Sequence, residues 1–294
     1  MRSVKGVLYL VLAGVMCSIG GVCIRLTAWQ PLAVNGGRGL VAACVTGLFL
    51  LYLRHRLTIN ASVVMGAVSL ALTMNLYVLS VRLTTAANAI LLMYTSPFFV
   101  MLYLWIFYKK RPTVRGGIAA MLVLGGLALL VAGSANTGGS LLGDALGLAS
   151  GAAYAGVFLV NVGADGDAFS SYFFGQLLAG IIGLPALLCE RDFSLQPMAC
   201  ILLLGVVQLG ISYIFMAKGV CLSSPFTASL VTCIEPVLSP VWVALLCGET
   251  MAGTALIGGA LVLCSVVLGS LPPKVGKARK QKLQHNAQNA NSKL

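Results

Sequence analysis

A carboxylate beside a proline, inside a long apolar run, is the feature of this sequence with the clearest capacity for chemistry. The pair is Glu235-Pro236, and the apolar run extends from Ser224 to Cys247. If the run crosses a bilayer, Glu235 lies roughly 16 Å from Ser224 along the helix, near the middle of a hydrocarbon core roughly 30 Å thick. A carboxylate at that depth is costly if it faces lipid, so we expect it to face the protein interior or a wet cavity.

Two interpretations of Glu235 are open at this stage. It could bind a proton or a cationic substrate. Alternatively, it could be a structural carboxylate that accepts hydrogen bonds from hydroxyls or from backbone donors near Pro236, since a proline removes one backbone donor and loosens the helix. An ionisable group beside broken helix geometry is how many carriers build a site at the membrane midplane.

The composition predicts a membrane protein with several spans. Of its 294 residues, 59% are hydrophobic and only 9% are charged, with a mean hydropathy of +0.97, whereas soluble domains carry roughly a quarter charged residues. The net charge of +12 does not indicate nucleic-acid binding, because the Lys and Arg residues lie between apolar runs. The sequence has no phosphate-binding G-x-x-x-x-G-K motif, and its two histidines, His55 and His285, predict no metal site. We therefore expect no cofactor and no enzymatic activity.

Apolar stretches of about 20 residues, the length of a spanning helix, set the predicted topology. There are ten, at residues 7–26, 31–53, 61–81, 84–107, 114–132, 141–161, 169–189, 197–217, 224–247 and 252–271. Fourteen of the 19 Lys and Arg residues fall on the side that holds the N-terminus, and three fall on the other. This asymmetry predicts that both termini are cytoplasmic in a multi-pass protein of the cell membrane. The basic, Gln/Asn-rich residues 272–294 predict a disordered cytoplasmic tail.

A weak internal repeat divides the spans into two sets of five. The repeat appears when the sequence is aligned with itself so that Pro97 lies on Pro236. A nearly equal shift aligns glycines at the starts of spans, pairing Gly6 with Gly143 and Gly14 with Gly151. Because each set has an odd number of spans, the second enters the membrane inverted. The predicted fold is therefore all-α, with ten transmembrane helices arranged as two inverted five-helix repeats, residues 1–134 and 135–271, around a central cavity.

Polar and aromatic side chains in the third, fourth, sixth and eighth predicted spans are candidates to line that cavity. They are Asn75, Tyr77, Asn88, Tyr94, Tyr154, Asn161, Gln208 and Tyr213. Rings can stack on a substrate while amides fix its polar end. The alternative for each residue is hydrogen bonding between helices.

Three further features have both a functional and a structural interpretation. Arg38, within the second span, could contact an anionic group of a substrate, or it could cap carbonyls within the bundle. Pro97 and Pro236 are predicted to kink the fourth and ninth spans, either as gating positions or as static kinks. Lys218, at the inner end of the eighth span, could reach for the membrane surface or could contact an anion.

One segment of the second half resembles a known family. The phrase Ile234-Glu235-Pro236-Val237, continued through Gly248-Glu249-Thr250 to Ile257-Gly258-Gly259, resembles an EamA-type member of the drug/metabolite transporter superfamily. Arg38 and Pro97 are also similar to that pattern, which covers roughly residues 5–271, whereas the first half departs from it at Lys109-Lys110. The resemblance implies secondary transport of small metabolites, often the export of amino acids or related compounds.

The sequence thus predicts a secondary transporter, with export favoured, that moves a small metabolite such as an amino acid by alternating access. Its expected partners are a small-molecule substrate and the lipid bilayer; coupling to a proton or another ion is left open, and the chain is expected to be a monomer or a homodimer. The alternatives are a carrier of choline-like cations or sugar phosphates, a lipid flippase, and a membrane assembly protein that transports nothing.

Overall fold

The computed structural model describes residues 2–20, 23, 27, 29–132, 140–163, 165–192, 194–247 and 253–270. Every regular element among these residues is a helix, in agreement with the predicted all-α class. The tail at 272–294 and the Gly248-Glu249-Thr250 phrase lie outside the described residues.

The helices follow the predicted apolar stretches in order. The first half contains α1 (Arg2–Cys17), α3 (Pro31–Tyr52), α4 (Ala61–Leu83), α5 (Ala86–Met93), α6 (Ser96–Ile106) and α7 (Val114–Ala132). The second half contains α8 (Leu141–Leu159), the 3-10 turn η1 (Val160–Val162), α9 (Ala168–Leu188), α10 (Leu195–Leu203), the π-helical segment η2 (Leu204–Ile211), α11 (Ser212–Leu222), α12 (Pro225–Thr232), α13 (Ile234–Cys247) and α14 (Gly253–Ser270). Helix α1 begins five residues before the predicted span, since a helix can extend beyond its apolar run.

Six helical runs in the described part of the chain are long and apolar enough to cross a membrane. They are Pro31–Tyr52, Ala61–Leu83, Asn88–Ile106, Leu141–Val162, Ala168–Leu188 and Leu195–Leu222, and three shorter apolar helices cover Val4–Cys17, Val114–Leu129 and Leu256–Ser270. The fourth and ninth predicted spans are each broken into two helices. A count of ten membrane spans stays a prediction.

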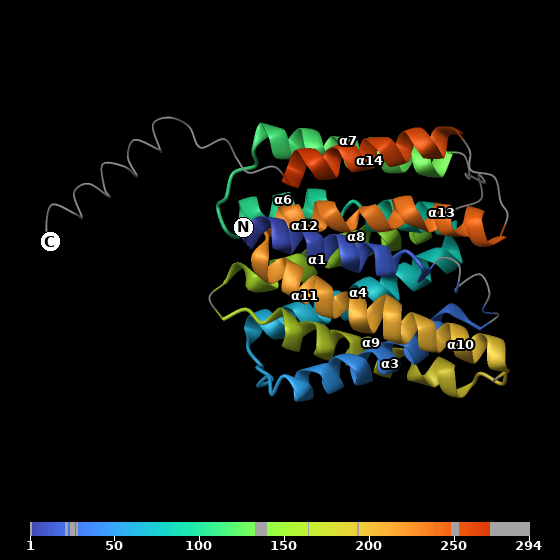
Figure 1. The fold of residues 1–294 in the computed structure, drawn as a ribbon. Coiled ribbons are helices and arrows are strands. Elements are labelled where there is room, and N and C mark those ends of the chain that lie inside the picture. Colours follow the sequence, from blue (N-terminus) through green and yellow to red (C-terminus); the bar gives the residue numbers. More distant parts are fainter. Residues whose placement is uncertain are drawn as a thin grey trace, which may run out of the picture.

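The helices lie side by side along one axis as a bundle (Figure 1). Helices α7 and α14 pack against each other at one edge, and α3 lies at the opposite edge against α9. Between them lie α1, α8 and the consecutive helices α12 and α13, all part of the middle of the bundle. The short helices α12 and α13 therefore lie close to its centre, and α5 and α6 pack against α8.

Glycines allow the helix backbones to approach closely. Where α3 crosses α9, a Cβ atom added at Gly36 would lie 2.6 Å from the Gly183 carbonyl oxygen, and one added at Gly39 would lie 2.9 Å from the Gly180 nitrogen. These distances are too short for a methyl group, so the contact requires glycine. Small residues serve this purpose in membrane bundles because lipid provides no hydrophobic drive for helix association.

The two halves make equivalent contacts at residues that the internal repeat pairs. A Cβ atom added at Gly6 of α1 would lie 2.9 Å from the Cβ atom of Leu222 in α11, and one added at Gly143 of α8 would lie 2.9 Å from the Cβ atom of Leu83 in α4. Thus α1 packs on the second half in the way that α8 packs on the first. The first helix of each half contacts the other half.

At the end of the bundle where α1 begins, Asp167 joins two loops. Its Oδ1 atom accepts a hydrogen bond from the Phe169 backbone nitrogen at the start of α9 (3.0 Å), and its Oδ2 atom lies 2.8 Å from His55 Nε2 and accepts from Thr58 Oγ1 (3.1 Å). Burial alone would raise the pKa of Asp167, but hydrogen bonds from Ser170 and His55 outweigh it and hold the pKa below its usual range. The carboxylate therefore both caps α9 and fixes the loop between α3 and α4.

Candidate functional site

Two broken helices form the frame of the candidate site. The backbone leaves helical geometry between α5 and α6 at Tyr94-Thr95, and between α12 and α13 at Cys233. Pro97 is the second residue of α6 and Pro236 the third residue of α13, positions in a first helical turn where a missing N–H leaves no bond unmade. Both prolines are buried. The sequence predicts kinks here, and the structure has them: one or two turn residues interrupt each span, and the Thr95 and Cys233 nitrogens still donate to carbonyls three residues back, at 3.2 and 3.1 Å.

Each break is packed by a glycine from the other half of the chain. A Cβ atom added at Gly151 of α8 would lie 2.6 Å from the carbonyl oxygen of Leu92, directly before the first break. At the second break, Gly14 of α1 lies against the side chain of Ile234 and near the backbone nitrogen of Glu235. The non-helical backbone is thus buried in protein, as unpaired backbone groups in a membrane require.

Glu235 begins α13 directly after the second break and lies deep in the bundle. It is surrounded by protein, although the residue as a whole is only partly buried. The groups with which it interacts electrostatically, Cys17, Arg38 and Tyr94, are only 8%, 6% and 1% exposed. Glu235 therefore lies among buried neighbours inside the bundle. The carboxylate is not placed on the outer surface of the bundle.

Arg38 is held by neutral amides. Its Nη2 and Nε atoms donate to Asn35 Oδ1 (3.1 and 3.3 Å), and its Nη1 atom donates to Gln208 Oε1 at 3.4 Å. Asn35 Nδ2 in turn donates to Asn75 Oδ1 (3.2 Å), and Asn75 Nδ2 donates to the Ala71 carbonyl (2.8 Å). The guanidinium is oriented by this chain, but none of these partners carries a negative charge.

Gln208 connects Arg38 to α1 from the π-helical segment η2. Its Nε2 atom donates to the Cys17 carbonyl at 3.2 Å, at the end of α1. The backbone carbonyl of Gln208 accepts a hydrogen bond from the Cys17 thiol at 3.3 Å and, through a short contact, from the Ser212 hydroxyl. A π-helix widens the turn and leaves backbone carbonyls free for such side-chain donors, and π-segments are frequent at functional sites.

Tyrosines form the walls around these charges. The rings of Tyr94 and Tyr154 meet edge to face with centroids 6.2 Å apart, and those of Tyr172 and Tyr213 meet in the same way at 5.4 Å. Tyr77 and Tyr213 lie within electrostatic reach of both Arg38 and Glu235. The Tyr94 hydroxyl lies near Glu235, but it makes no hydrogen bond of regular geometry.

Two of the predicted residues lie away from this cluster. Asn88 is in the first turn of α5, where its Nδ2 atom donates to Thr84 Oγ1 (3.4 Å) and its backbone nitrogen donates to Thr85 Oγ1. Asn161 lies after α8 and donates to the Cys221 sulfur at 3.1 Å. The other predicted polar and aromatic residues come together: Arg38, Asn75, Tyr77, Tyr94, Tyr154, Gln208, Tyr213 and Glu235.

Sequence reasoning missed two members of the cluster. Asn35 had a usable signal, because it is three residues before Arg38 and therefore on the same helix face. Cys17 had none, since a cysteine in an apolar helix is ordinarily a small packing residue. Within the part of the chain that the structure describes, no three His, Cys, Asp or Glu side chains group closely enough to hold a metal ion.

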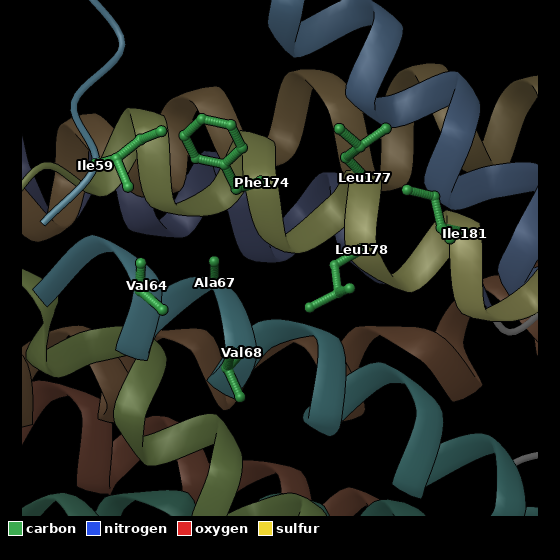
Figure 2. Close-up of a pocket in the computed structure, with 8 residues that line it drawn as sticks. All are labelled: Ile59, Val64, Ala67, Val68, Phe174, Leu177, Leu178 and Ile181. Atoms are coloured by element: carbon green, nitrogen blue, oxygen red, sulfur yellow. The ribbon is translucent and has the colours of Figure 1, made fainter. Parts of the chain in front are cut away.

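A groove on the side of the bundle, between α4 and α9, is apolar, whereas the cluster is charged and polar (Figure 2). It has a volume of about 320 Å³ and is lined only by apolar residues: Ile59, Val64, Ala67, Val68, Phe174, Leu177, Leu178 and Ile181. A polar metabolite would find no hydrogen-bonding side chain there. The charged and polar cluster at the two helix breaks is therefore the candidate substrate site.

A bundle of long apolar helices in two equivalently packed halves, with charged groups at a pair of broken helices, defines a class of multi-pass membrane carriers. The EamA-like transporter family matches the chain twice, over residues 4–132 and residues 141–271. The chain belongs to this family, and it is a multi-pass membrane transporter.

Relatives and a solved structure agree with that assignment. "Uncharacterized inner membrane transporter YicL" of Salmonella typhimurium is 25% identical over 289 residues, covering 91% of this chain and 95% of the relative. "Uncharacterized transporter YwfM" of Bacillus subtilis is 27% identical over 224 residues, covering 73% and 75%. A solved structure, described only as "Crystal structure of protein", has a TM-score of 0.78 at 17% identity, covering 92% of this chain and 98% of its own. That last likeness shows the fold alone.

Proposed function

We propose that this transporter is a secondary carrier of small zwitterionic metabolites such as amino acids, and that it exports them across the cell membrane. The observation that carries the proposal is the separated pair of opposite charges at the helix breaks. Arg38 and Glu235 interact electrostatically, yet they form no direct ion pair. A substrate with a carboxylate and an ammonium group complements both.

The energetics of buried charge favour this assignment. A charge in a low-dielectric interior is costly unless a counter-charge or water satisfies it. Arg38 has only the amide oxygens of Asn35 and Gln208, and Glu235 keeps part of its surface accessible. In the proposed mechanism the carboxylate of the substrate pairs with Arg38 and its ammonium group pairs with Glu235. The tyrosines pack on the apolar part of the substrate.

Alternating access follows from the proposed inverted repeats, residues 1–134 and 135–271. The equivalent contacts of Gly6 and Gly143 support two related halves. Both termini would be cytoplasmic, and the central cavity would lie between the third, fourth, eighth and ninth spans. Pro97 and Pro236 would act as the hinges at which the two broken spans change their angle.

Proton coupling would use the same carboxylate. Glu235 cannot hold a proton and a substrate ammonium group at once, so a proton that enters from outside would displace the substrate. Loss of that proton to the cytoplasm would restore the site. This exclusion is sufficient for exchange of one substrate against a proton, without a second titratable group in the cavity.

Matched substrates test the proposal. In proteoliposomes, each amino acid of a panel would be compared with the amine that lacks its carboxylate and with the acid that lacks its amine, with and without a pH gradient. We expect the zwitterion to be transported at least about tenfold faster than either analogue, because a missing partner leaves a buried charge unpaired. Transport of choline-like cations or sugar phosphates in preference to amino acids, or of lipids instead, would contradict it.

Arg38→Gln tests the role of the cation. It should abolish amino-acid transport while leaving the protein monodisperse. Arg82→Gln is the matched control, since Arg82 is an exposed arginine near the end of α4 that donates to Gln30 Oε1 at 2.7 Å. Equal transport activity of the two variants would show that Arg38 does not bind the substrate.

A further inference from the structure

A lysine in α11 is enclosed by aromatic rings from three helices. Lys218 Nζ lies 5.3 Å from the ring centroid of Phe49 in α3, 5.8 Å from that of Tyr9 in α1 and 5.9 Å from that of Phe215 in its own helix. The rings of Tyr9 and Phe215 are themselves stacked, with centroids 6.0 Å apart. The ammonium group is therefore held in one place by several weak attractions.

The burial pattern of α11 shows that this lysine faces away from the central cluster. One stripe of the helix is partly exposed and consists of Ile211, Phe215, Lys218 and Leu222. The opposite face is buried and carries Tyr213, Met216, Ala217 and Val220. Lys218 therefore lies on the partly exposed side of α11, between Tyr9 of α1 and Phe49 of α3.

The charge of Lys218 has no counter-ion in the part of the chain that the structure describes. It forms no ion pair and donates no hydrogen bond there, although an ammonium group has three donors. The internal repeat predicts no lysine at this position, since the alignment of Pro97 with Pro236 places Leu79 opposite Lys218. Three rings attract a cation but accept no strong hydrogen bond, so the ammonium donors are open to a ligand from outside this part of the chain.

We propose that Lys218 and its three aromatic rings bind the phosphate of an anionic phospholipid. The site lies about one helical turn from the end of α11, at the end of the bundle where α1 begins, which is the depth of a lipid headgroup. Lys5 is four residues before Tyr9 on the same face of α1 and adds a second, exposed cation. With the proposed topology, this is the cytoplasmic leaflet.

The surroundings favour a lipid over a dissolved anion. On the same face of α1, Leu8 and Leu12 are 57% and 37% exposed, and beside Phe49 in α3, Leu48 is 67% exposed. These exposed apolar side chains lie on the two helices that flank the lysine and would contact the acyl chains. A dissolved phosphate would contact only the ammonium group. An anionic lipid would contact the ammonium group through its phosphate and the exposed leucines through its acyl chains.

Lipid retention tests this site independently of any transported substrate. The full-length protein would be reconstituted with equal amounts of phosphatidylglycerol and phosphatidylcholine and extracted into mild detergent, and its bound lipids counted by native mass spectrometry. We expect preferential retention of phosphatidylglycerol. Lys218→Met should lower that preference about fivefold, and Lys218→Arg should keep it. Lys110→Met is the matched control, because Lys110 lies over a single ring, Tyr108, at 6.0 Å.

Two results would overturn the proposal. One is an unchanged lipid ratio in Lys218→Met, or an equal loss in Lys110→Met. The other is displacement of phosphatidylglycerol by excess inorganic phosphate, which would assign the site to a dissolved anion. If Lys218→Met does not fold, a photoreactive phosphatidylglycerol on the unaltered protein decides the question. Its cross-links should map to residues 5–12 and 211–222, and cross-links elsewhere alone would contradict the site.

Discussion

The break between α5 and α6 and the break between α12 and α13 have the same backbone design and different chemistry. In each, a proline stands in the first turn of the second helix, and a glycine from the other half of the chain packs against the break. The alignment that pairs the two prolines also places Ser96 of the first break on Glu235 of the second. Ser96 is fully buried and its hydroxyl has no partner among the described residues. The two breaks thus share their backbone arrangement, whereas the departure from symmetry provides the charge.

The chemical difference between the two breaks is tested most directly by removing the charge from the second break. We predict that Glu235→Gln lowers transport about thirtyfold or more, because the loss of one partner of a buried charge pair costs about 2–5 kcal/mol. Ser96→Ala should stay within about threefold of the unaltered protein, since its hydroxyl makes no bond that would be lost. Transport is measured in proteoliposomes and normalised to monodisperse protein.

A purely structural Glu235 would give a different pattern. Glu235→Gln would then reduce the yield of folded protein while transport per folded molecule, and its dependence on pH, would stay normal. Glu190→Gln is the control for the loss of a carboxylate, because Glu190 lies outside the cluster and accepts only a long hydrogen bond of 3.4 Å from the Gln30 backbone nitrogen.

The glycines at the two breaks should tolerate a methyl group unequally. At Gly151 an added Cβ atom would meet the backbone carbonyl of Leu92 at 2.6 Å, and backbone cannot move away easily. At Gly14 the nearest atom is the Cγ2 methyl of Ile234, a side-chain atom that can shift more easily than a backbone carbonyl. We predict that Gly151→Ala destabilises the protein by about 2–3 kcal/mol and that Gly14→Ala costs about 1 kcal/mol or less. Thermal unfolding in detergent measures both, and an equal loss would show that the two breaks are packed alike.

A smaller difference is expected at the starts of α3 and α9, which the alignment of Gly6 with Gly143 also pairs. Asp167 caps α9 through its side chain, whereas Gln30, its equivalent, makes no side-chain cap on α3. Asp167→Ala should cost about 1 kcal/mol and Gln30→Ala close to nothing, measured by thermal unfolding at neutral pH. A larger loss in Gln30→Ala would contradict the assignment of the cap.

The Asp167 carboxylate also predicts that the free energy of unfolding depends on pH. Its pKa is lower in the folded protein than in the unfolded chain, so the ionised form stabilises the fold. That contribution is complete above the usual aspartate pKa of about 3.9 and is lost as the pH falls through the lowered pKa. Acidification should therefore narrow the difference in stability between the unaltered protein and Asp167→Asn.

The smallest expected effect is at Tyr94, directly in the first break. Its hydroxyl makes no hydrogen bond of regular geometry, so Tyr94→Phe should change the stability by less than about 0.5 kcal/mol. A change in transport without a change in unfolding temperature would show that the hydroxyl serves the substrate. A large loss of stability would show instead that it holds the break.

Much of the fold follows from the sequence because bilayer thickness fixes the length of an apolar helix. The sequence predicts the second span at 31–53, and α3 covers Pro31–Tyr52; it predicts the sixth at 141–161, and α8 covers Leu141–Leu159. The positions of the breaks also follow from Pro97 and Pro236, since proline cannot donate a helical hydrogen bond. The π-helical turn of η2 has no such signal, because any run of Leu, Val and Gly suits an α-helix equally well.

The cluster of charges could be predicted only in part. A charged residue inside a span is visible in the sequence, so Arg38 and Glu235 are candidates without any structure. Their partners are not, since Gln208 is 170 residues from Arg38 and no local spacing connects them. Asn88 and Asn161 have the same residue type as Asn75, and only the packing of the helices places Asn75 in the cluster and the other two outside it.

The contacts of α1 have a consequence for how the chain is made. Gly6 and Gly14 rest on residues near 222 and 234, so α1 finds these partners only after α11 and the start of α13 have been synthesised. Until then α1 must wait in the membrane beside lipid or a chaperone, while α8 can dock on α4–α6 as soon as it is inserted. A ribosome that stops after α10 would therefore leave α1 unpaired, and such truncated chains should be cleared by membrane proteases faster than chains that end after α13.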